Sequence, residues 1–166
     1  MPQLYADTGS RSPYYSPSGR IPVAIIPAAI LLALAVLPGA WLYAWASVRA
    51  PWVIGCTVGL LFAAALALMV EYAVRKAKVR NPLWMGRMGI LIGSSAWYAH
   101  WIAYLGIVSG LSVGQFEASP NALLNFLRIG ASDLSVDSAL FVGARLAELA
   151  MLLIPPYVFG KYTATE

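Results

Sequence analysis

Four long stretches of apolar residues alternate with short polar stretches along this chain. The apolar stretches cover about residues 22–48, 52–74, 86–108 and 138–159. Each is at least as long as the roughly 20 residues that an α-helix needs to cross the hydrocarbon core of a bilayer. The pattern therefore predicts an all-α bundle of four transmembrane helices, with residues 21–162 forming a single membrane domain.

The polar stretches predict two further segments. In the longest connection, residues 109–137, the part from Pro120 to Ile129 mixes apolar and polar side chains as in a helix that lies on a membrane surface. Ser119 suits the N-cap position before it, and we expect a short amphipathic surface helix there. Residues 1–20 are polar and rich in turn-forming residues, which predicts a disordered cytoplasmic tail.

Composition supports a membrane protein over a water-soluble one. Of the 166 residues, 60% are hydrophobic and only 11% are charged, whereas soluble domains carry about 25% charged residues. The positions of lysine and arginine predict the orientation. Eight lie in the tail, between the second and third spans, or at the C-terminus: Arg11, Arg20, Arg75, Lys76, Lys78, Arg80, Arg87 and Lys161.

The other two connections hold only Arg49 and Arg128. Because connections rich in lysine and arginine stay on the cytoplasmic side, we expect both termini in the cytoplasm and residues 109–137 outside. Membrane topology therefore explains the net charge of +4, and no nucleic-acid partner is expected.

Small residues recur at helical spacing in the second and third spans. Residues of this kind allow the backbones of two helices to approach closely. Such a pattern fits packing within one subunit and packing between subunits equally, and it begins with a GxxxG motif. The predicted packing positions are Gly55, Gly59, Ala63, Gly86, Gly89 and Gly93.

The last span carries two charged residues, Arg145 and Glu148, near its middle. They are three apart, so they are neighbours on one face of a helix, and a charge at bilayer depth costs a few kcal/mol. Three interpretations remain open. The pair stabilises the bundle, or it serves transport or catalysis in a polar cavity, or the span is shallow and Arg145 extends outward.

His100 is the only histidine, and it lies in the third span one helical turn from Trp97 and Tyr104. It fits a hydrogen-bonded histidine between helices, and also a proton relay with Glu148. A single histidine and a single cysteine, Cys56, build no metal site. The sequence therefore predicts no metal, no cofactor and no catalytic residue.

Two groups of side chains are expected at the membrane interfaces. Trp41, Tyr43 and Trp45 follow one another near the end of the first span, which is typical of an aromatic belt. Glu71 precedes Arg75 by four residues, which predicts an ion pair along one helix face.

Three short motifs lie beside the spans: Tyr15-Ser16-Pro17-Ser18-Gly19-Arg20, Lys78-Val79-Arg80-Asn81-Pro82 and Asn121-Ala122-Leu123-Leu124. They resemble motifs of a group of uncharacterised bacterial membrane proteins. The resemblance implies a multi-pass protein of the bacterial inner membrane. It brings no activity with it, so no functional residue is carried over.

Three functions fit these features. The first is a non-enzymatic accessory or assembly subunit, whose partners are membrane lipid and either another membrane protein or a second copy. The second is a small oligomeric proton-linked transporter or channel. The third is a lipid-acting enzyme that uses His100, Arg145 and Glu148. It ranks last because the chain has no phosphate-binding loop, no HExxH motif and no nucleophile elbow.

Overall fold

A computed structural model gives the arrangement of the long helices. The residues that it describes are 23, 25–110, 121, 124, 125, 128 and 136–165. The long helices in these ranges are α1 (Ile25–Arg49), α2 (Trp52–Ala77), α3 (Pro82–Ser109) and α5 (Val136–Thr163). The predicted tail lies outside the described residues. Of the predicted surface helix only Asn121, Leu124, Asn125 and Arg128 are described, and all four are exposed.

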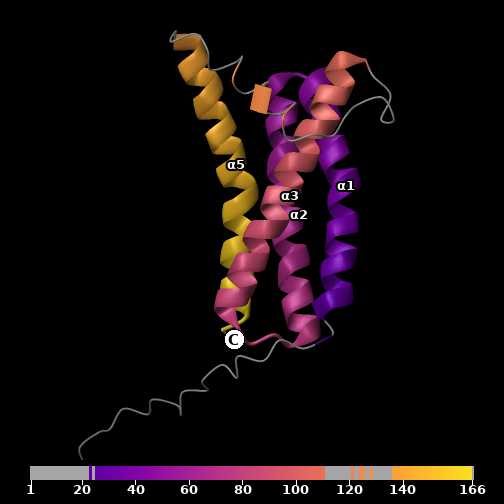
Figure 1. The fold of residues 1–166 in the computed structure, drawn as a ribbon, viewed down its shortest axis with the longest axis vertical. Helices are drawn as coiled ribbons and strands as arrows, with labels where there is room; N and C mark the ends of the chain where they lie inside the picture. The colour runs from indigo at the N-terminus through magenta and orange to yellow at the C-terminus, as the bar shows by residue number, and fades with distance from the viewer. Residues whose placement is uncertain are drawn as a thin grey trace, which may run out of the picture.

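The four helices stand side by side in a bundle (Figure 1). Helices α1 and α5 each pack against both α2 and α3, whereas α2 and α3 barely touch each other. The bundle is therefore a ring in the order α1, α2, α5, α3. The first turn of α1 and the last turn of α5 lie at the same end (Figure 1).

The two ends of the bundle differ in charge. At one end α2 stops and α3 starts, and this basic end carries Arg75, Lys78, Arg80 and Arg87. At the opposite end, called the far end below, α1 stops and α5 starts. Helix α2 begins at the far end, where α1 stops, and α3 begins at the basic end, where α2 stops. The connections from α1 to α2 and from α2 to α3 are therefore short, whereas the connection between α3 and α5 is long.

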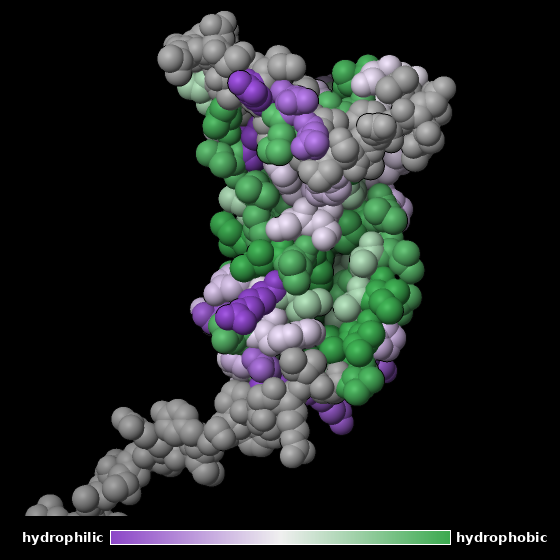
Figure 2. Space-filling view, viewed as in Figure 1, coloured by the Kyte–Doolittle hydropathy of each residue, from purple (hydrophilic) through white to green (hydrophobic). Residues whose placement is uncertain are grey.

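Three of the helices, α1, α2 and α5, are long and apolar enough to cross a membrane. Their outward side chains include Leu31, Leu61 and Leu146, all largely exposed. Hydrophobic residues cover much of the visible surface between the two ends (Figure 2). Soluble proteins rarely expose apolar surface on this scale, so the three helices identify an integral membrane protein.

Helix α3 has 28 residues but is not among those three. Ser94 and Ser95 interrupt its apolar run, and His100 and several aromatic residues follow. It begins at Pro82 rather than at the predicted residue 86, because Asn81 caps it: the Asn81 side-chain oxygen accepts a hydrogen bond from the backbone N–H of Trp84 at 3.0 Å. Proline is favoured directly after such a cap.

Glycines bring α3 and α5 into backbone contact. A Cβ atom added at Gly93 would lie 2.5 Å from the carbonyl oxygen of Leu152, and one at Gly89 would overlap the backbone of Pro156. Pro156 has no N–H, so it donates no helical hydrogen bond to the carbonyl of Leu152, four residues earlier. Helix α5 nevertheless continues to Thr163, beyond the predicted end near residue 159. The close α3 backbone supports this part of α5, as neighbouring helices do for prolines in membrane helices.

Candidate functional site

A cluster of polar side chains joins α3 to α5 inside the bundle. The Nε2 atom of His100 lies 2.9 Å from the Oε1 atom of Glu148, and the two residues are only 1% and 7% exposed. The contact is short but poorly aligned as a hydrogen bond. It becomes an ion pair when the His100 ring is protonated.

Arg145 holds the other oxygen of the same carboxylate. Its Nη1 donates to Oε2 of Glu148 at 2.9 Å, so the pairing expected from their spacing is confirmed. The guanidinium carbon also lies 4.6 Å from the ring centre of Trp101, a cation–π contact that is stronger away from water. Glu148 therefore has a cationic or potentially cationic neighbour at each of its oxygens.

Aromatic rings enclose His100. The Tyr43 ring of α1 stacks on it with 4.0 Å between ring centres, and Trp101 meets it edge-on at 5.6 Å. The Nδ1 atom of His100 is buried and has no hydrogen-bond partner within the described part of the chain. Buried polar atoms in proteins usually have a hydrogen-bond partner, so the Nδ1 atom is an exception.

The position of Tyr43 corrects the predicted aromatic belt. Trp41 and Trp45 are 52% and 45% exposed, as a belt requires, but Tyr43 is only 8% exposed. On a helix, a residue two positions from each neighbour faces roughly the opposite side. Tyr43 therefore belongs to the polar cluster, and its offset from the two tryptophans was the signal for this in the sequence.

The cluster lies on the wall of an open cavity, which we call the chamber, of about 490 Å³. All four helices contribute, and they do so in the half of the bundle nearer the far end. In this half α5 leans away from the other helices (Figure 1). The polar side chains that line the chamber are Tyr43, Ser47, Tyr104, Arg145 and Glu148. Glu148 is thus buried between the helices, but it also lines the open chamber.

The chamber also contains two side chains with nucleophilic atoms, Ser47 and Cys56. The Ser47 hydroxyl donates a hydrogen bond to the Tyr43 carbonyl at 2.8 Å, so it is bound to its own helix. Cys56 is exposed. Neither has a recorded contact with His100, the base that nucleophilic catalysis would need.

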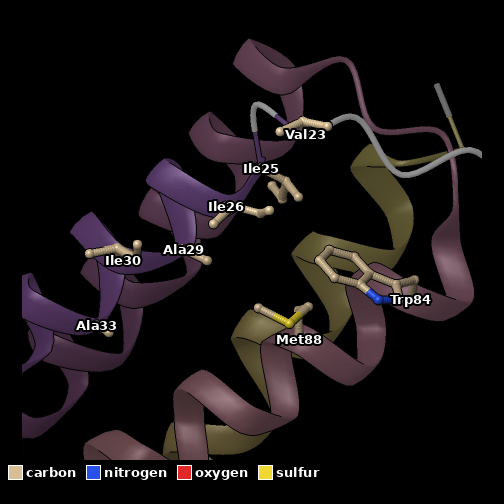
Figure 3. Close-up of a pocket in the computed structure, with 8 residues that line it drawn as sticks. All are labelled: Val23, Ile25, Ile26, Ala29, Ile30, Ala33, Trp84 and Met88. Carbon is tan, nitrogen blue, oxygen red and sulfur yellow. The ribbon is translucent and has the colours of Figure 1, made fainter.

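A second cavity, between α1 and α3, contrasts with the chamber. It measures about 520 Å³ and its walls are apolar apart from the indole of Trp84. Figure 3 shows Ile25, Ile26 and Ala29 on one side facing Trp84 and Met88 on the other. With no ionisable side chain in its lining, this cavity offers no chemistry, and lipid fills such a space in a membrane.

The small residues predicted for helix packing lie against neighbouring helices. A Cβ atom at Gly59 would meet the Tyr43 ring at 2.8 Å and the end of Met151 at 3.0 Å, and one at Gly55 would lie 3.5 Å from the Ser47 backbone. Ala63 is buried. In α3, Gly86 faces the ring of Tyr157, while Gly89 and Gly93 face the α5 backbone.

The predicted pair of Glu71 and Arg75 is also present. The Nε atom of Arg75 lies 2.9 Å from Oε1 of Glu71 on the exposed side of α2. Pairs of this kind contribute little to stability. Among the described residues, no group of three His, Cys, Asp or Glu side chains is arranged to hold a metal ion.

Comparison of the chain with protein-family models, with curated proteins and with solved structures found no match. The function is therefore argued from the chamber itself.

Proposed function

We propose that the protein spans the bacterial inner membrane four times, with both termini in the cytoplasm. The 28 residues of α3 correspond to about 42 Å of helix, more than the roughly 30 Å of a hydrocarbon core. His100 and Trp101 of α3 are buried within the bundle, whereas Ser94 and Ser95 are exposed. The excess of lysine and arginine at the basic end supports a cytoplasmic location for that end. The chamber then opens toward the outer side.

We propose further that the protein is a small proton-linked transporter that binds its solute in the chamber. One observation carries this proposal: the buried carboxylate of Glu148 contacts both His100 and Arg145 on the wall of an open cavity. Ionisable residues within membrane spans mark proton relays and solute paths. Histidine is the side chain best suited to exchange a proton with a neighbouring carboxylate near neutral pH.

The accessory role has weaker support. Its main argument was the stripe that contains Gly55 and Gly59, and both glycines lie against α1 of the same chain. This contact accounts for their small size without a second protein. The lipid-acting enzyme has three ionisable residues in one place, but the hydroxyl of Ser47 is already bound to backbone.

Cys56 provides a direct test that the chamber contains water. It is the only cysteine and it lines the chamber, so a membrane-impermeant maleimide should label it in intact spheroplasts. The matched control is Leu61→Cys in a Cys56→Ser background, because Leu61 is on the same helix and faces lipid. Thiols in lipid stay unreacted. Labelling of Leu61→Cys but not of Cys56 would refute a water-filled chamber.

Proton coupling is tested in proteoliposomes by measuring currents on a solid-supported membrane across a panel of solutes. We expect Glu148→Gln to abolish the solute-induced current. Glu71→Gln is the control, since Glu71 is a carboxylate of α2 that pairs with Arg75 and does not line the chamber, and it should leave the current intact. Currents that survive in Glu148→Gln would disprove the coupling role of Glu148.

A further inference from the structure

We propose that the solute is an anionic amphiphile with a single hydrocarbon chain, whose head enters the chamber while its chain lies in a groove between α2 and α5. This inference rests on the proposed transport function and names the class of solute. It is carried by the shape, the lining and the direction of the two adjoining cavities.

The groove between α2 and α5 measures about 560 Å³. Five of its lining residues are alanines, whose short side chains leave this space open beside the contact between the two helices. Larger apolar residues such as Leu68, Ile154 and Phe159 complete the walls. The alanines are Ala63, Ala64, Ala67, Ala147 and Ala150. An apolar groove of this kind suits a hydrocarbon chain and offers nothing to a water-soluble metabolite.

The groove and the chamber adjoin each other. Leu60, Ala147 and Met151 line both of them. On one side of these three residues the lining is apolar, and on the other side it contains Arg145 and Glu148. A ligand that occupies both cavities must therefore have one apolar end and one polar end.

The direction of the cavities matches a lipid of the outer leaflet. Both α2 and the groove run from the chamber toward the basic end, as Leu60 is followed by Leu68 along the groove. A molecule bound there has its head toward the far end and its chain toward the middle of the membrane. The outer half of α5, with Leu140 and Leu146 exposed, leans away from the bundle (Figure 1).

The charge of the cluster indicates an anionic head. Arg145 and Glu148 together carry no net charge, so an anion placed beside them would be repelled by the Glu148 carboxylate. The Arg145 side chain is 29% exposed and lines the chamber, so its guanidinium can also bind a carboxylate or a phosphate there. When Glu148 takes up one proton, the repulsion between Glu148 and that anion falls. One anion then enters with one proton, and the charge within the membrane stays balanced.

The test uses palmitate with a diazirine in the middle of its chain, added to proteoliposomes of the full-length protein and cross-linked by light. We expect cross-links on the α2 and α5 residues that line the groove. Ala64→Trp fills the groove and should reduce cross-linking about tenfold, equivalent to about 1.4 kcal/mol of binding free energy. Ala64→Leu should give a smaller loss. Leu61→Trp, on the lipid-facing side of α2, should have no effect.

Competition identifies the head. Unlabelled palmitate and a lysophosphatidate should both displace the probe, and whichever displaces it at lower concentration identifies a carboxylate or a phosphate. An uncharged monoacylglycerol with the same chain should compete about tenfold less well. Equal competition by the monoacylglycerol would overturn the anionic head, and equal cross-linking of Ala64→Trp would overturn the groove. These two outcomes concern the class of solute only. Labelling of Cys56 by the maleimide would still support the proposed transport function in either case.

Discussion

The Nε2 atom of His100 on α3 lies 2.9 Å from the Oε1 atom of Glu148 on α5. The two side chains connect these helices inside the bundle, and Arg145 occupies the other carboxylate oxygen. The same cluster forms part of the chamber wall. Its charges therefore affect the stability of the bundle, and under the proposed function also the binding of a solute.

Removal of Glu148 alone should destabilise the protein. Glu148→Ala removes the carboxylate that the Arg145 guanidinium contacts at 2.9 Å. We expect the free energy of unfolding to fall by about 2 kcal/mol, less than the roughly 3–5 kcal/mol of a fully buried pair because Arg145 is partly exposed. Unfolding in bicelles by titration with a denaturing detergent measures the change.

The double variant Arg145→Ala/Glu148→Ala tests whether the two residues act as a pair. Each single variant already loses the contact between Arg145 and Glu148, so the loss in the double variant should be smaller than the sum of the two single losses by about 1 kcal/mol. His100→Ala in the same background should then cost little more. Additive losses within about 0.5 kcal/mol would contradict a coupled cluster.

The close packing of α3 on α5 can be tested at Gly93. Gly93→Ala places a Cβ atom 2.5 Å from the Leu152 carbonyl oxygen, so the helices must separate, and we expect a loss of about 1–3 kcal/mol. Gly106→Ala is the control in the same helix, since nothing lies within 4 Å of its added Cβ. Thermal denaturation in one detergent compares the two variants, and equal midpoints would refute the close contact.

The long apolar runs allowed the helices to be predicted from the sequence, because length and hydropathy decide whether a segment crosses a bilayer. The ends were less certain. The start of α3 depends on the cap formed by Asn81 before Pro82, a signal that the sequence contains but that hydropathy does not reveal. The end of α5 depends on how the α3 glycines support Pro156, and only tertiary structure shows that.

The site was predictable in part, for a similar reason. Arg145 and Glu148 share one helix, so their spacing predicted the pair. The addition of His100 depends on the relative position of α3 and α5 along their axes, which no local pattern encodes. Tyr43 was assigned to the membrane interface, although its offset from Trp41 and Trp45 placed it on the inner face.

A third prediction concerns the end of α2. Lys78 has φ 51° and ψ 41°, the left-handed conformation that costs a side-chain-bearing residue about 1–2 kcal/mol. The N–H of Val79 bonds to the Val74 carbonyl at 3.2 Å, as in helix ends that usually carry glycine at this position. Lys78→Gly should therefore be more stable than Lys78→Ala by about 1 kcal/mol. Both variants remove the charge of Lys78, so charge does not distinguish them. Equal stability of Lys78→Gly and Lys78→Ala would show that the left-handed backbone at this position stores no strain.

The orientation of the bundle makes the last prediction, because it decides from which side a solute reaches the chamber. In a Cys56→Ser background, Lys76→Cys places a thiol at the basic end and Arg128→Cys places one in the connection before α5, both at exposed positions. An impermeant maleimide added to intact spheroplasts should label Arg128→Cys alone, and permeabilisation should add Lys76→Cys. The positive-inside distribution of charge is the physical reason. The reverse pattern would turn the chamber toward the cytoplasm, and an outer-leaflet amphiphile could then no longer enter it head first.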